Sequence, residues 1–115
     1  MKATTVAKKI ATALDDMKAL DVRVMDVRKI TTIADVIIIA SGRSDRHLRA
    51  LAESAAETGR GCKLRVLGTE GERTGEWVLV DLGDIIVHLM HPTTRAYYQL
   101  EKLWGGGKHD MDMPG

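Results

Sequence analysis

The sequence predicts a single α/β domain in which helices cover a mixed β-sheet of about five strands. Stretches with helical periodicity lie near both ends and in the middle of the chain, separated by short apolar runs typical of strands. Residues 36–40 are apolar and mostly β-branched, as in a central strand covered on both faces. The 115 residues are 44% hydrophobic and 29% charged, which suits one soluble globular domain.

The first predicted element is an amphipathic helix over residues 5–20. Val6, Ile10, Leu14 and Met17 recur in it at steps of three and four residues. A second helix follows a glycine-containing link, with Ser44 or Asp45 as its N-cap and Gly59 or Gly61 at its end.

A third helix is predicted to open at Pro92, a residue suited to a first helical turn. Its predicted apolar face consists of Ala96, Tyr97, Leu100, Leu103 and Trp104. Its predicted solvent-facing residues are Arg95, Gln99 and Lys102. Three glycines from Gly105 end the helix, so we expect one domain over residues 1–104 and a flexible tail over residues 105–115.

Alternating or fully apolar runs predict the strands. They span residues 22–27, 35–40, 62–67, 77–80 and 85–90. Between the last two, Gly83 supplies the positive φ that a two-residue hairpin connection requires. The predicted order of elements is α-β-β-α-β-β-β-α, with the helices covering a mixed sheet.

Charge and cysteine content restrict the function. Seventeen basic and sixteen acidic residues give a formal net charge of +1, which argues against general affinity for a phosphate backbone. Cys62 is the only cysteine, so no internal disulfide forms, and a reducing cytoplasm is the expected location. No signal peptide or membrane-spanning run is evident.

A search for catalytic residues finds weak candidates. Cys62 falls in a predicted strand, where a packed thiol is the better interpretation. His88 and His91 are three residues apart, which on a strand directs them to opposite faces and makes shared metal ligation poor. A hydrogen-bonded, partly buried histidine is the expected role of His88.

The carboxylates need separate consideration, because a strand, a glycine turn and a helix followed by acidic strands is the outline of a nucleotidyltransferase. Such an enzyme needs two carboxylates on one strand face, two residues apart, to hold Mg²⁺. No predicted strand carries that pair, and Asp110 and Asp112 lie in the tail. A minimal Mg-dependent enzyme using Asp35, Asp81 and Asp84 is the alternative function.

The hairpin carries the candidate binding residues. Leu82 falls at its predicted tip and Trp77 at its base, and there is no phenylalanine in the chain. Either both side chains fold back on the core, or they form a docking patch rimmed by carboxylates. The candidate partner-binding residues are Trp77, Leu82, Asp81, Asp84, Glu70, Glu72 and His88.

Three stretches, DVIIIASGRSDRH, LGTEGERTGEWVLVDLGDIIVHLM and RAYYQLEKLWG, together resemble the iojap-related ribosomal silencing factors of bacteria. The resemblance covers roughly residues 26–104. The extension from Gly105 departs from members that stop near Trp104, so no role is assigned to it.

This resemblance implies a nucleotidyltransferase-like fold without the catalytic carboxylates, and no enzymatic activity, cofactor or metal. It implies binding to the large ribosomal subunit through large-subunit ribosomal protein fourteen, a basic RNA-associated protein. Such binding would block joining of the small subunit and lower translation when nutrients are scarce. The resemblance also implies a homodimer when the protein is free.

Overall fold

The computed structural model of the protein describes residues 2–71, 76–100 and 102. Within these ranges the elements follow the predicted order α-β-β-α-β-β-β-α. Their bounds are α1 Ala3–Asp16, β1 Leu20–Asp26, β2 Val36–Ser41, α2 Asp45–Gly61, β3 Gly68–Glu70, β4 Trp77–Asp81, β5 Ile85–Met90 and α3 Pro92–Tyr98. None of the helices in the described ranges is long and apolar enough to cross a membrane.

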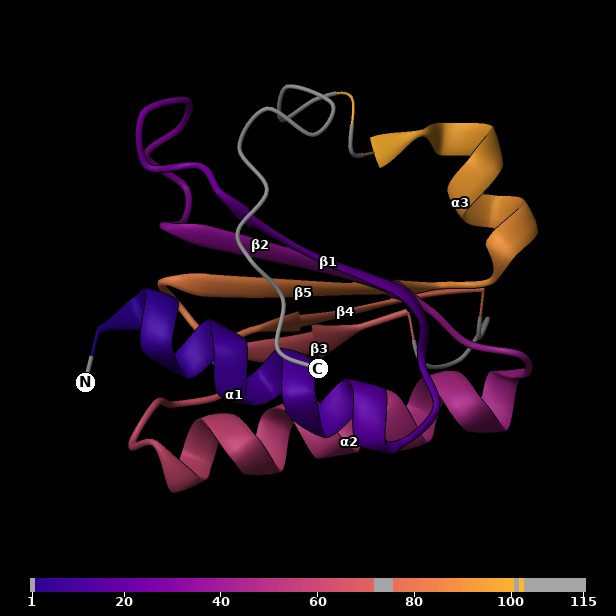
Figure 1. The fold of residues 1–115 in the computed structure, drawn as a ribbon, viewed down its shortest axis with the longest axis horizontal. Helices are drawn as coiled ribbons and strands as arrows, with labels where there is room; N and C mark the ends of the chain where they lie inside the picture. Colours follow the sequence, from indigo (N-terminus) through magenta and orange to yellow (C-terminus); the bar gives the residue numbers. More distant parts are fainter. Residues whose placement is uncertain (1, 72–75, 101, 103–115) are drawn as a thin grey trace.

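The five strands form one mixed sheet in the order β1-β2-β5-β4-β3. β2 and β5 are parallel, and the other neighbouring pairs are antiparallel. All six residues of β2 are buried, which confirms the predicted central strand. α1 and α2 lie together against one face of the sheet, and α3 lies on the other side (Figure 1). The predicted fold class is therefore confirmed.

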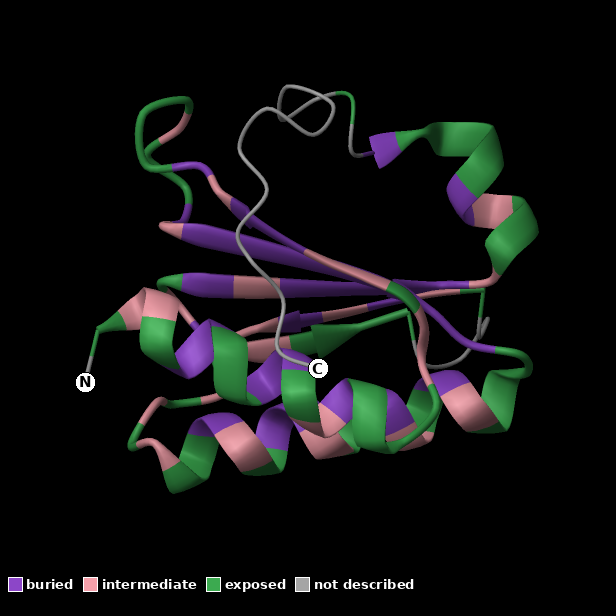
Figure 2. Ribbon diagram, viewed as in Figure 1, coloured by how far each residue is buried: buried purple, intermediate pink, exposed green. Residues whose placement is uncertain are grey.

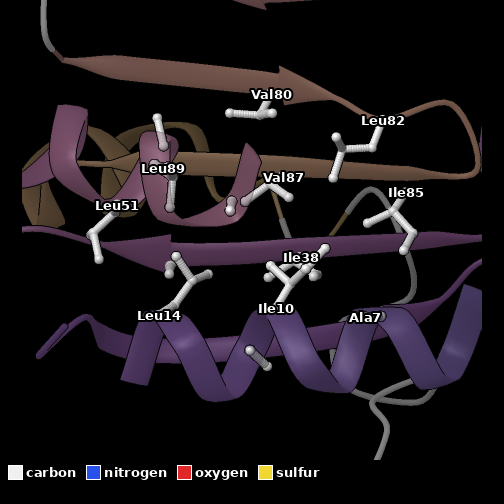
Figure 3. Close-up of a cluster of buried hydrophobic side chains, with 14 of the residues drawn as sticks. Ala7, Ile10, Leu14, Ile38, Leu51, Val80, Leu82, Ile85, Val87 and Leu89 are labelled. Carbon is white, nitrogen blue, oxygen red and sulfur yellow. The ribbon is translucent and has the colours of Figure 1, made fainter. Parts of the chain in front are cut away.

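The main core fills the space between the sheet and the two long helices. Figure 3 shows Ile10 and Leu14 of α1 directed toward Ile38, Val87 and the other strand residues. The sheet-facing sides of α1 and α2 are buried, whereas most of α3 is exposed (Figure 2). A second, smaller cluster lies on the opposite face of the sheet and comprises Met25, Val27, Ile37, Ile39, Met90 and Leu100, with Trp77 packed against it.

α1 ends at Asp16, four residues before the predicted end at residue 20. Lys18 adopts a left-handed conformation with φ 65°. The backbone N–H groups of Lys18 and Ala19 then donate to the carbonyls of Asp15 and Leu14, at 2.9 and 3.1 Å. This is a Schellman motif, in which the left-handed position is usually occupied by glycine. Here a lysine takes the position, so no glycine marks the end of the helix, and the apolar periodicity extended the prediction too far.

The same motif follows α2 and explains why the strand predicted over residues 62–67 is wrong. Lys63 has φ 67°, and the N–H of Leu64 donates to the carbonyl of Gly59 at 2.9 Å. The residues after Gly61 are therefore used to cap the helix. Pairing with β4 begins only at Leu67, whose N–H donates to the Asp81 carbonyl at 2.8 Å. The strand itself, β3, begins at the next residue, Gly68. Cys62 is partly buried against the main core at the helix end, and not within a strand.

The start of α2 is tied to the end of α1. The Ser44 hydroxyl accepts from the His47 N–H at 3.0 Å, so Ser44 is the N-cap of the two candidates. The His47 ring accepts from the Arg43 N–H through Nδ1 at 2.9 Å, and its Nε2 lies 2.8 Å from the Met17 carbonyl oxygen. Nε2 therefore carries the proton and donates to Met17.

The predicted faces of the last helix are partly wrong. Ala96 and Tyr97 are exposed, whereas Arg95 is only 6% exposed. Arg95 faces inward because its guanidinium donates to the Asp21 carbonyl of β1 and the Ser41 hydroxyl of β2. The helix also ends at Tyr98, because Gln99 adopts a left-handed conformation with φ 48°. Residues beyond Gln99 therefore do not continue one helical stripe. Leu100 is buried as predicted, and Gln99 and Lys102 are exposed as predicted. Leu103, Trp104 and the tail lie outside the described residues.

Candidate functional site

The candidate site lies on the sheet face turned away from α1 and α2, which we call the α3 face. Val78 and Val80 of β4 belong to the main core on the helix side. Side chains alternate along a strand, so Trp77, Leu79 and Asp81 point to the α3 face. The same alternation puts Ile86 and His88 of β5 on that face, in register with Asp81 and Leu79.

Four rings form a continuous row on this face, which we call the aromatic ladder: His88, Trp77, Tyr98 and Tyr97. The successive ring centroids are 5.8, 5.1 and 5.0 Å apart, within the range of favourable aromatic contacts. His88 is 8% exposed, Tyr98 55% and Tyr97 81%. The ladder therefore leads from the buried sheet to the surface and presents two tyrosines to solvent.

His88 supports the ladder from below. The Trp77 indole Nε1–H donates to His88 Nδ1 at 3.0 Å, which places the histidine proton on Nε2. Burial disfavours the charged imidazolium and lowers the pKa of His88 from 6.5 to about 4. The ring is thus a neutral acceptor that holds the indole in position, which confirms the expected hydrogen-bonded histidine. Any contribution of His88 to partner binding would be made through Trp77.

This burial predicts a pH dependence of stability. The unfolded chain takes up a proton at His88 near pH 6.5, whereas the folded chain resists protonation until about pH 4. The free energy of unfolding should therefore fall as the pH decreases from 6.5 to 4, by about 3 kcal/mol from this residue. Urea unfolding at pH 7 and pH 4.5 measures the loss. His88→Gln keeps a hydrogen-bond acceptor for Trp77 but has no group that titrates in this pH range. A loss of stability of the same size in that variant would contradict the assignment of the pH dependence to His88.

The predicted acidic rim is partly assembled. Glu70 lies opposite Leu79 in the β3–β4 register and is exposed on the α3 face. Asp81 is half-buried on the same face, and its Oδ1 accepts from the Gly83 N–H at 2.9 Å. Asp84 is exposed in the hairpin loop. Glu72 lies outside the described residues.

Leu82 is not at the tip of the hairpin: of the two alternatives, packing on the core is correct for this residue, and its place among the partner-binding candidates is wrong. Its N–H donates to the Ile85 carbonyl at 2.9 Å, so the two-residue loop is Gly83–Asp84. Gly83 has the expected positive φ of 84°. Leu82 continues the alternation of Val78 and Val80 and points into the main core (Figure 3). It is 3% exposed and packs against Gly59 of α2. The alternation of apolar residues at Val78, Val80 and Leu82 was the sequence signal that could have assigned Leu82 to the core.

Arg95 is a residue that sequence reasoning missed. Its Nη1 donates to the Asp21 carbonyl at 2.7 Å and to the Ser41 hydroxyl at 3.3 Å. At the other end of the helix, His91 Nε2 lies 2.8 Å from Asp45 Oδ1 at the start of α2. These contacts fix α3, and with it Tyr97 and Tyr98, relative to the sheet. An arginine between Thr94 and Ala96 on a helix carries no sequence signal for burial.

Among residues 2–71, 76–100 and 102, no group of three or more His, Cys, Asp and Glu side chains is arranged to hold a metal ion. His91 contacts Asp45, while His88 contacts Trp77. What the α3 face offers is exposed aromatic area, of a kind that is enriched at protein interfaces, together with carboxylates.

The fold and this face describe a mixed α/β domain with exposed aromatic and acidic side chains, and comparisons with known proteins identify its family. A protein-family model described as "Ribosomal silencing factor during starvation" (RsfS) matches residues 1–114. The Ribosomal silencing factor RsfS of Chromobacterium violaceum is 41% identical over 108 residues, which are 94% of this chain and 88% of that protein. The chain therefore belongs to the ribosomal silencing factor family.

Two further similarities extend this result. The protein named Iojap-related, mitochondrial, of Arabidopsis thaliana is 33% identical over 103 residues, 86% of this chain and 56% of that protein. A crystal structure of a protein from Chromobacterium violaceum superposes with a TM-score of 0.88 at 38% identity, covering 100% of this chain and 92% of that one. The iojap-related resemblance is thus confirmed. The family match runs past Trp104, where we expected the family's pattern to stop.

Proposed function

We propose that this protein represses translation by binding the large ribosomal subunit through large-subunit ribosomal protein fourteen. The bound protein blocks joining of the small subunit and so lowers translation under nutrient limitation. It acts in the cytoplasm, without catalysis or a cofactor, and is a homodimer when free. Family membership supports the ribosomal role, and the contact assignment rests on the α3 face.

The observation that carries the assignment is the aromatic ladder beside exposed carboxylates. Aromatic side chains supply much of the binding energy at protein interfaces, because they bury a large area at a low entropic cost. Tyr97 and Tyr98 are the most accessible rings of the ladder, and Trp77 supports Tyr98, which in turn contacts Tyr97. Glu70 adds negative charge opposite Leu79, and Asp84 adds it at the hairpin end of β4 and β5, away from Trp77. Negative charge on this protein complements a basic ribosomal protein and speeds its approach.

Repression by this route requires only that the protein occupy its site on the large subunit. A protein seated on the surface that the small subunit must contact excludes it sterically. The degree of repression then depends on the affinity of this protein relative to that of the competing subunit.

Co-sedimentation tests the proposal. Purified protein is mixed with isolated large subunits, and small subunits are then added. We expect the protein to sediment with the large subunit and the fraction of joined ribosomes to fall with increasing protein concentration. Tyr98→Ala should restore joining, whereas Glu57→Ala, an exposed change on α2, should not. Sedimentation with the large subunit without any loss of joining would refute the blocking mechanism.

A further inference from the structure

We propose that a small pocket beside α3 receives one cationic side chain, a lysine or an arginine, of the ribosomal partner protein. The inference rests on the proposed function for the identity of the partner. The pocket itself is argued from its lining, its size and its rigidity.

The pocket has a volume of about 240 Å³ and is lined by Glu76, Thr93, Thr94, Tyr97 and Tyr98. Pockets that enclose small-molecule ligands typically measure roughly 300–1,000 Å³. The smaller volume suits a single side chain inserted from a docked protein. Its position at the outer end of the aromatic ladder puts it within the surface assigned to partner binding.

The lining is suited to a positive charge. Tyr97 and Tyr98 meet edge to face at 83°, so their planes stand at nearly a right angle beside the pocket. Ring faces attract lysine and arginine through the π-electron quadrupole. Glu76 adds an exposed carboxylate, and the threonine hydroxyls add acceptors. The described lining residues include no basic side chain, so nothing among them competes with an incoming cation.

The pocket is also held in shape before binding. The backbone N–H of His91 donates to the Glu76 carbonyl at 3.2 Å, which joins one wall to the start of α3. Arg95 and the His91–Asp45 contact fix the helix itself. A preformed pocket loses less conformational entropy on binding, so even a partly exposed cation contact contributes to affinity.

The test measures the affinity of purified large-subunit ribosomal protein fourteen for single and double variants over a range of salt concentrations. Glu76→Gln and Tyr97→Leu should each weaken binding roughly fivefold to tenfold. Tyr97→Phe keeps the ring face and should bind nearly as well as the wild type. The double variant should lose less than the product of the single losses, because both residues act on one cation. Glu76→Gln should also reduce the salt dependence, and the matched control Glu57→Gln on α2 should not.

Wild-type affinity in Glu76→Gln and Tyr97→Leu would overturn the pocket assignment, as would fully additive losses. Should the wild type itself not bind protein fourteen, the proposed function fails, and a second probe decides the pocket alone. Arginine ethyl ester, titrated into the protein, should shift the NMR signals of the Tyr97 and Tyr98 rings in the wild type but not in Glu76→Gln. Absence of any shift in the wild type would then refute the pocket as well.

Discussion

Replacing Trp77 by alanine is expected to reduce affinity for the large ribosomal subunit by about 2 kcal/mol or more, on the order of 30-fold. Trp77 contacts both His88 and Tyr98, so its removal breaks the aromatic ladder in the middle. Tyr98 loses its support, and His88 Nδ1 loses the indole donor. Because a buried acceptor without a partner is unfavourable, the fold is also destabilised, by about 2 kcal/mol.

The two effects of the Trp77 variant are separable. Binding is measured by co-sedimentation at a temperature where circular dichroism shows the variant to be folded. Trp77→Phe keeps a ring against Tyr98 but cannot donate to His88, so it should retain most of the affinity while losing some stability. Wild-type binding by a folded Trp77→Ala would show that the ladder is not the partner-binding surface.

Replacing Leu82 by glutamate is expected to unfold the protein, or nearly so, and any loss of ribosome binding would follow from that. Leu82 is 3% exposed and packs within the main core against Gly59 of α2. An unpaired carboxylate at this site has to be desolvated or protonated, which costs about 4 kcal/mol or more. Domains of this size are stable by roughly 5–15 kcal/mol, so little stability would remain.

Urea unfolding of a graded series checks the role of Leu82. Leu82→Ala should lower the free energy of unfolding by about 2–4 kcal/mol through the cavity it leaves. Leu82→Met conserves volume and should cost less than about 1.5 kcal/mol. A Leu82→Glu protein as stable as the wild type would mean that the side chain is exposed and would return it to the candidate binding residues.

Much of the fold could be predicted from local pattern. The 3.6-residue periodicity of Val6, Ile10 and Leu14 identified α1, and the apolar run of β2 identified a strand covered on both faces. Gly83 fixed the hairpin turn. These features can be predicted from sequence because each depends on only a few neighbouring residues. This holds for the helix and strand periods and for the conformational freedom of glycine. The motifs around Trp77 and Tyr98 also indicated the family.

The sequence was less informative where one residue's role depends on distant neighbours. Lys18 and Lys63 follow their helices in left-handed conformations that lysine does not favour. The predicted end of α1 was therefore four residues too late, and the strand predicted after α2 was placed too early. Arg95 is buried where it donates hydrogen bonds to the Asp21 carbonyl and the Ser41 hydroxyl. Both partners lie in strands far from Arg95 in sequence, so no local pattern could predict its burial.

The proposed binding surface shows the same division. Composition and alternation determined that Trp77, Asp81 and their neighbours share one face of the sheet. The packing of α2 determined that Leu82 belongs to the core, and the position of α3 determined that Tyr97 and Tyr98 extend the row from Trp77 to the surface. Local periodicity assigns a side chain to a face, but only the elements packed on that face decide whether it is covered or exposed to a partner.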